Sequence, residues 1–125
     1  MTDLTVVILT KNEEKNIRKC IESFRGCVRR FVIVDSYSND NTETICKELD
    51  IELRKIGSRL DFYQNKWVSY ADQLNWGLQN TNITTTWSMR MDADEEIMAD
   101  LAQEIEEKLP RIESPVNGVI LRRRV

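Results

Sequence analysis

Four acidic residues stand within five positions, directly after a stretch with the pattern of a β-strand. Residues 86–91 alternate large apolar side chains with polar ones, as expected of a strand. The acidic residues that follow are Asp92, Asp94, Glu95 and Glu96. Clustered carboxylates repel one another, and Mg²⁺ or Mn²⁺ prefers hard oxygen ligands and often holds substrate phosphates as well. The pattern fits a divalent-cation site. It equally fits solvated residues at the start of the next helix, where acidic side chains suit the positive end of the helix dipole.

Two other polar clusters follow predicted strands. Residues 10–13 (Thr-Lys-Asn-Glu) come after the apolar, β-branched run 4–9, and Asp35 opens a polar run at the end of the apolar stretch 31–35. In a parallel sheet, ligands collect beyond the carboxyl ends of the strands, where the strand order reverses. Three such clusters on one rim predict a binding site. Thr10 and Glu13 also have the spacing of a capping box, a role compatible with ligand binding.

The elements that must position these clusters alternate along the chain. We predict strands at residues 4–9, 31–35, 51–56 and 87–91, and a further strand within 117–125 that begins at 118–121. Helices are predicted at 13–24, around 45–49, at 67–78 and around 101–109, with a longer loop at 57–66. The alternation predicts an α/β fold with a mostly parallel sheet flanked by helices and right-handed crossovers.

Several side chains are assigned packing or solvent roles by their spacing. The helix at 67–78 is expected to bury Ala71, Leu74 and Leu78, and the helix around 101–109 to bury Leu101, Ile105 and Leu109. Gln73 and Asn75 are two positions apart on a helix, so at most one is expected to reach the site. Arg59 could approach a diphosphate from its loop, but a solvated role is favoured.

Composition narrows the possible chemistry. The chain has 125 residues and no histidine, which excludes Ser-His and Cys-His nucleophiles and histidine general bases within it. The net charge of -3 argues against a nucleic-acid partner. Its three cysteines lack the pairing of zinc ligands, and Cys20 is expected to be a buried free thiol. Without a membrane-spanning stretch or a signal-peptide layout, a cytoplasmic location is expected.

Four motifs in order resemble those of the inverting glycosyltransferases of family 2, which have the GT-A fold. The motifs are residues 6–14 (VVILTKNEE), 34–42 (VDSYSNDNT), 70–78 (YADQLNWGL) and 87–95 (WSMRMDADE). The resemblance covers nearly the whole chain and leans toward the subgroup that decorates lipopolysaccharide cores and other bacterial surface glycans. It implies the Rossmann-like donor half of a GT-A domain.

The resemblance also implies roles for individual residues. Asp94 and Asp92 would bind Mg²⁺ or Mn²⁺ and the diphosphate of a nucleotide sugar. Thr10, Asn12, Glu13, Asp35 and Ser36 would line the nucleoside pocket. The second motif more often has paired aspartates, and Ser36 stands at the second position here. A UDP-sugar is favoured as the donor, but the base stays open because a hydroxyl cannot accept a ring N–H as a carboxylate would.

The implied reaction is metal-dependent transfer of a sugar, with inversion, to a hydroxyl of a glycan or lipid-linked acceptor. In this family the catalytic base follows the metal motif at a distance, so it is expected beyond Val125. The resemblance implies that residues 1–125 form one domain without the acceptor-binding half. Two alternatives are a non-catalytic sugar-nucleotide-binding module and a nucleotidyltransferase of similar fold. Contact with the inner face of a membrane stays open because of the basic run 122–124.

Overall fold

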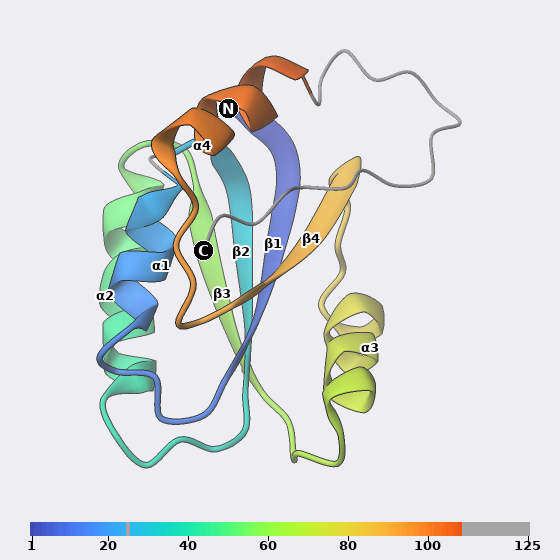
Figure 1. The fold of residues 1–125 in the computed structure, drawn as a ribbon. Helices are drawn as coiled ribbons and strands as arrows, with labels where there is room; N and C mark the ends of the chain where they lie inside the picture. Colours follow the sequence, from blue (N-terminus) through green and yellow to red (C-terminus); the bar gives the residue numbers. More distant parts are fainter. Residues whose placement is uncertain (25, 109–125) are drawn as a thin grey trace.

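The computed structural model describes residues 1–24 and 26–108, which form a parallel sheet with helices on both faces (Figure 1). The strands are β1 (Thr2–Thr10), β2 (Val28–Asp35), β3 (Arg59–Gln64) and β4 (Trp87–Asp92). The helices are α1 (Ile17–Ser23), α2 (Thr42–Arg54), α3 (Tyr70–Asn80) and α4 (Ala99–Lys108). All three strand pairings are parallel, and the order is β3-β2-β1-β4. The predicted α/β fold with a parallel sheet is confirmed.

The two faces of the sheet are covered unequally. Helices α1 and α2 lie on one face and α3 on the other (Figure 1). The larger core packs apolar residues of α1, α2 and α4 against alternate residues of the strands, such as Val6, Ile8 and Ile33. On the other face, within the part of the chain that the structure describes, Val7, Val32 and Val34 form a smaller buried cluster, with Leu74 and Trp76 of α3 packed against it. The strands are therefore buried on both faces where α3 covers them, as their continuous apolar sequences predict.

A glycine lets α3 approach the sheet closely. A Cβ at Gly77 would lie 2.9 Å from a methyl group of Val34 and 3.4 Å from one of Val7. The first separation is too short for two carbon atoms, so only glycine fits here without a shift of the helix. The close approach fixes the height of α3 above β1 and β2, and therefore the position of the polar side chains that α3 turns toward the sheet.

The third strand was predicted in the wrong place. Residues 51–56 are the end of α2 and the turn after it, and β3 occupies Arg59–Gln64 within the predicted loop. Helix α2 buries Cys46, Leu49 and Leu53 at helical spacing and leaves Ile51 62% exposed. In β3, Leu60 and Phe62 pack into the larger core, whereas Arg59 and Asp61 on the other face are charged. Because of these charges the segment was predicted to be a loop. Arg59 lies at the start of this strand, not in a loop.

Two helical details also differ from the prediction. Helix α3 buries Gln73 and Gly77 and leaves Ala71 and Leu78 exposed, because the polar Gln73 side chain finds partners under the helix. Helix α1 begins at Ile17, and its N-cap is Asn16 without a side-chain capping bond. Thr10 belongs to β1 instead of a helix start, so the predicted capping box is wrong.

Two smaller sequence predictions are confirmed, one at β4 and one at the cysteines. Strand β4 places Met89 and Met91 against the larger core, as predicted. The three cysteines are free and buried. No helix among the described residues is both long and apolar enough to cross a membrane. The predicted strand within 117–125, Leu109 and the basic run 122–124 lie outside the described residues.

Candidate functional site

The strand order places the site at the carboxyl ends of β1 and β4. The chain moves from β1 to β2 and β3 in one direction and then returns to place β4 on the other side of β1. The order therefore reverses between β1 and β4, where ligands bind in open parallel sheets. Thr10 is level with Asp35 on β2, and Leu9 is level with Asp92 on β4. The three polar clusters predicted from the sequence therefore share one rim.

Asp35 is a buried carboxylate that organises this rim. It is 0% exposed, and its Oδ1 accepts hydrogen bonds of 2.6 Å from the hydroxyl groups of Thr10 and Ser38. Its Oδ2 accepts from the Ser38 main-chain N–H at 2.7 Å and from the Gln64 amide at 3.5 Å. Buried polar groups in proteins are normally hydrogen-bonded in this way. Asp35 thus fixes the start of the loop after β2, and Thr10 is buried beside it.

The loops after β1 and β2 are joined by hydrogen bonds through Asn12. Its main-chain N–H donates to the Ser38 hydroxyl at 2.7 Å, and its Oδ1 accepts from the Asn39 N–H at 2.9 Å. Asn12 has a φ of 54°, a left-handed conformation that asparagine tolerates better than most residues. The predicted binding residue Asn12 therefore holds the two loops together while its side chain stays largely exposed.

The neighbouring residues add three more links between the loops. The Lys11 ammonium donates to the Tyr37 carbonyl, and the Glu13 N–H donates to the Thr42 hydroxyl at 2.9 Å. The Glu14 N–H donates to Asp40 at 3.2 Å. Glu13 itself is half-buried, and its carboxylate accepts from the Asn16 amide at 3.1 Å. The two loops thus behave as one cross-linked unit beside the end of β1.

Ser36 is anchored from the opposite face of the sheet by Gln73 of α3. Gln73 is 1% exposed, and its amide nitrogen donates to the Ser36 hydroxyl at 3.1 Å and to the Asn65 carbonyl at 3.0 Å. Its amide oxygen accepts from the Asn65 side chain at 2.9 Å, which fixes the orientation of the amide. Since Ser36 accepts from Gln73, its own O–H hydrogen is available to donate. Asn75 is exposed, so only Gln73 reaches the rim, as predicted.

The acidic motif forms a turn at the end of β4. The Glu95 N–H donates to the Asp92 carbonyl, and the Asp92 N–H donates to a Glu95 carboxylate oxygen, both at 3.0 Å. Asp92 is half-buried and its Oδ1 accepts a long bond of 3.4 Å from the Tyr70 hydroxyl. Ala93 is buried, whereas Asp94 is exposed. The spacing of the motif thus turns Asp94 outward while Asp92 stays close to the sheet.

The negative charge of this turn affects the pKa of a buried thiol, Cys20. Cys20 donates from Sγ to the Asp92 carbonyl at 3.6 Å. Burial raises the pKa of Cys20 to about 12, and the carboxylates of Glu95, Glu96, Asp94 and Asp92 contribute to the rise. The thiol therefore stays neutral at physiological pH. The same four carboxylates make the rim beside β4 attractive to cations.

The residues present fit a divalent cation that is completed by substrate. No cluster of three or more potential metal ligands occurs among the described residues. Mg²⁺ is usually held by one or two carboxylates together with substrate phosphates and water, and Asp92 and Asp94 supply that number. A site of this kind needs no third protein ligand.

Two contributors to the rim were not predicted from the sequence. Tyr70 lies between Asp92 and Arg90, whose guanidinium carbon is 5.1 Å from the centre of its ring. Ser38 bridges Asp35 and Asn12. A serine three positions after a strand-end aspartate is a signal of a local side-chain turn and could have identified Ser38. Tyr70 is distant in sequence, and only the packing of α3 brings it to β4.

An open parallel sheet with helices on both faces and a polar rim at the switch point defines an α/β protein of the Rossmann-like type. The family model for glycosyl transferase family 2 matches residues 5–125. The chain therefore belongs to glycosyl transferase family 2. The predicted family is confirmed.

Two relatives illustrate the similarity in sequence. An uncharacterized glycosyltransferase of Rickettsia felis is 29% identical over 106 residues, covering 85% of this chain and 34% of the relative. The lipopolysaccharide core biosynthesis glycosyltransferase LpsC of Rhizobium meliloti is 31% identical over 121 residues, covering 96% of this chain and 42% of LpsC. The chain spans about a third of the length of the Rickettsia relative.

Two solved structures share the fold. TarS of S. aureus (residues 1–349, in complex with UDP-GlcNAc) aligns with a TM-score of 0.63 at 20% identity, over 83% of this chain and 30% of TarS. The mannosyltransferase PcManGT of Pyrobaculum calidifontis, in complex with GDP-Man and Mn²⁺, aligns with a TM-score of 0.66 at 22% identity, over 83% and 31% of the chains. At these identities the likeness establishes the fold.

Proposed function

We propose that this chain binds the nucleotide-sugar donor of a glycosyltransferase reaction, in which the sugar is transferred with inversion to a hydroxyl acceptor. The observation that carries the proposal is the rim at the β1–β4 switch point. There the turn that carries Asp92 and Asp94 follows β4 beside the end of β1, and the cross-linked loops follow Thr10 and Asp35. A diphosphate across this rim would meet the acidic turn, and a nucleoside would lie along the two loops.

In this proposal Asp94 and Asp92 hold Mg²⁺ or Mn²⁺ with the donor diphosphate. When bound, the cation neutralises the negative charge that develops on the nucleoside diphosphate as the leaving group. The exposed Asp94 is the more accessible ligand, and Tyr70 restrains Asp92 through its hydroxyl. We assign no described residue to the general base.

The nucleoside is proposed to lie against Asn12, Glu13 and Ser36. Because Gln73 donates to Ser36, the Ser36 hydroxyl is set to donate to a carbonyl oxygen of a base. Uracil and guanine both offer such an oxygen, and a UDP-sugar is our favoured donor. The structures of TarS and PcManGT hold UDP-GlcNAc and GDP-Man, respectively.

A glycan or lipid-linked acceptor is proposed because one relative, LpsC, is named for lipopolysaccharide core biosynthesis. The same reading favours a cytoplasmic location.

Calorimetric titration of the chain with UDP and with GDP, each in Mn²⁺ and in EDTA, tests the proposal. We expect binding only with the metal, and a preference that identifies the base. Asp94→Ala should weaken metal-dependent binding by about tenfold or more, the effect of losing a charge-assisted contact. Glu48→Ala, which removes an exposed acid on α2, is the matched control and should bind as the wild type does. Equal affinity in the Asp94 and Glu48 variants would overturn the metal assignment.

A further inference from the structure

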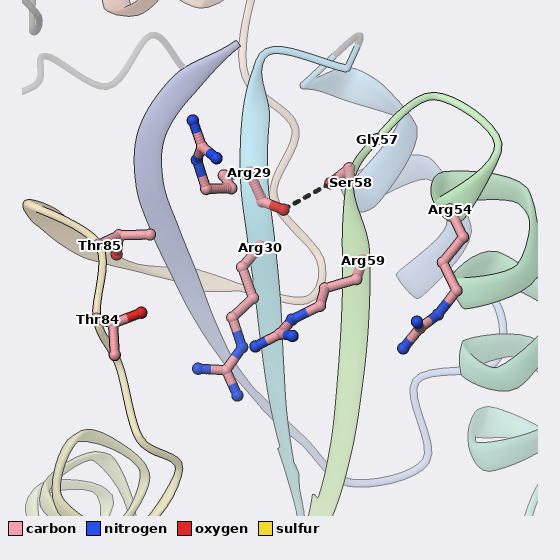
Figure 2. Close-up of a pocket in the computed structure, with 8 residues that line it drawn as sticks. All are labelled: Arg29, Arg30, Arg54, Gly57, Ser58, Arg59, Thr84 and Thr85. Atoms are coloured by element: carbon pink, nitrogen blue, oxygen red, sulfur yellow. Dashed lines mark hydrogen bonds between the residues drawn. The ribbon is translucent and has the colours of Figure 1, made fainter.

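Arginines gather at the amino ends of the strands, at the opposite edge of the sheet from the acidic rim. A pocket of about 510 Å³ is lined by Arg29, Arg30, Arg54, Gly57, Ser58, Arg59, Thr84 and Thr85 (Figure 2). From Arg30 to Asp35 the strand β2 runs five residues, about 17 Å at the usual rise. This pocket is therefore separate from the proposed donor site.

The pocket carries an excess of positive charge. Asp3 pairs with Arg29, Asp50 with Arg54, and Asp61 with both Arg30 and Arg59. Four guanidinium groups thus share three carboxylates, although the chain as a whole has a net charge of -3. The excess arises at Asp61, whose single charge serves two arginines. An anionic ligand would balance it.

Arg30 forms the fixed wall of the pocket. Its side chain is 6% exposed, and its Nε donates to Asp61 at 2.7 Å. Its Nη atoms donate to the Thr81 and Asn82 carbonyls and to the Tyr63 hydroxyl, at 2.8, 3.1 and 3.2 Å. These bonds use nearly all its donors, so Arg30 contributes its charge and its rigid position. Arg59 lies beside it on the shared carboxylate (Figure 2).

Arg29 and Arg59, like Arg54, keep the outer ends of their guanidinium groups open to a ligand. Their side chains are 57% and 51% exposed, and each ion pair is made through Nε, at 3.4 and 3.2 Å. Their Nη groups donate no hydrogen bond within the described part of the chain. An arginine whose forked end is open matches the oxygens of a phosphate group in a bidentate manner. Thr84, at the other side of the pocket, is exposed and offers a hydroxyl.

We propose that this pocket binds phosphate groups at a second anion site beyond the donor site, through Arg59 beside Arg30 and through Arg29, whose guanidinium points toward the other end of the pocket (Figure 2). A terminal phosphate group carries about −1.5 to −2 charges at pH 7 and has three oxygens that accept hydrogen bonds. It can therefore compensate the unmatched guanidinium while the existing carboxylates stay in place. The ligand is either a soluble phosphorylated molecule or the headgroup of an anionic lipid, since both present the same chemistry.

Titration with inorganic pyrophosphate in EDTA tests the proposal, because the donor site is expected to need a metal. The wild type should bind, and the double variant Arg29→Gln/Arg59→Gln should lose affinity by about tenfold or more. Arg18→Gln removes an arginine that pairs with glutamates on α1 and α2 and is the matched control. Binding by the control and by Asp94→Ala should equal that of the wild type. Thermal melting of each variant checks folding.

Sedimentation with vesicles distinguishes the two sources of phosphate. Capture on phosphatidic acid but not on phosphatidylcholine, lost in the double variant, identifies a lipid headgroup. Pyrophosphate binding without vesicle capture identifies a soluble ligand. The proposal is overturned if the wild type does not bind pyrophosphate or if the double variant binds as tightly as the wild type. Loss of this binding in Asp94→Ala would assign it to the acidic rim and also overturn it, without affecting the donor-site titration in Mn²⁺.

Discussion

Each end of the sheet has one buried, hydrogen-bonded ionisable side chain, which is acidic at the carboxyl ends of the strands and basic at the amino ends. At the carboxyl ends a buried carboxylate, Asp35, accepts bonds from the last residue of β1 and from the loop after β2. At the amino ends a buried guanidinium, Arg30, donates to the carbonyls that follow α3. Each charge is saturated by hydrogen bonds and each ties an adjoining loop to the sheet. Acids then surround one end and arginines the other.

The direction of the helices explains why the signs differ. In a parallel sheet each helix begins near the carboxyl ends of the strands and returns its last turn to the amino ends. The first turn of a helix favours negative groups and the last turn favours positive ones. Arg30 binds the main-chain carbonyls at the end of α3, and Arg54 stands in the last turn of α2. Arginines at the amino ends of the strands therefore stabilise the fold, and in our proposal the same positive charge binds phosphate.

The largest expected effect comes from breaking the amino end. Arg30→Met should lower the free energy of unfolding by about 3 kcal/mol, because it leaves a half-buried carboxylate and two carbonyls without their donor. Asp61 keeps Arg59 as a partner, so the loss should lie at the low end for a buried pair. Urea denaturation measures it. Arg54→Met breaks an exposed ion pair and should cost about 0.5 kcal/mol or less. Equal losses of unfolding free energy in the two variants would show that the burial of Arg30 does not stabilise the amino end of the sheet.

Gln73→Leu tests the link between α3 and the carboxyl end. The change keeps the volume but removes both amide donors and the acceptor, and should cost about 1–2 kcal/mol in urea. Metal-dependent nucleotide affinity should fall with it because Ser36 loses its anchor, whereas pyrophosphate binding in EDTA should not change. Asn75→Leu, at an exposed position on the same helix, should leave stability and both affinities as in the wild type. If Gln73→Leu left the nucleotide affinity unchanged, Ser36 would not be part of the donor site.

A smaller, pH-dependent effect is expected at Asp40. Partial burial works to raise its pKa, but hydrogen bonds from the Thr42 side chain and main chain, and from the Glu14 N–H, lower it below the usual value. A lowered pKa in the folded state means that the carboxylate stabilises the fold above its unfolded pKa of about 3.9. That contribution is lost as the pH falls through the lowered value.

Asp40→Ala should therefore cost about 1 kcal/mol at neutral pH, and the difference from the wild type should shrink as the pH falls below about 4. Urea denaturation at a series of pH values measures the difference. Thr44→Ala, at an exposed position in the first turn of α2, is the control and should show no such pH dependence. A difference that persists at low pH would mean that the charge of Asp40 is not what holds the loop.

The sequence predicted most of the carboxyl end and little of the amino end. The polar clusters that begin at Asp35 and at Asp92 could be found because each directly follows an apolar run in the chain. The third strand was missed because it carries charged residues, Arg59 and Asp61, which are explained only once Arg30 is placed beside them. The roles of Tyr70 and Gln73 likewise depend on where α3 packs, which Gly77 permits.

The sequence by itself determined β1, β2 and β4 through their apolar runs, the parallel sheet that follows from the alternation of strands and helices, the acidic rim and the family. Local patterns suffice for these because each depends on neighbours in the chain. The tertiary structure alone decided that Asp35 is buried and saturated, that Asp94 is exposed, and that the arginines share one pocket. Those facts depend on contacts between residues distant in sequence, whose energies no local pattern records.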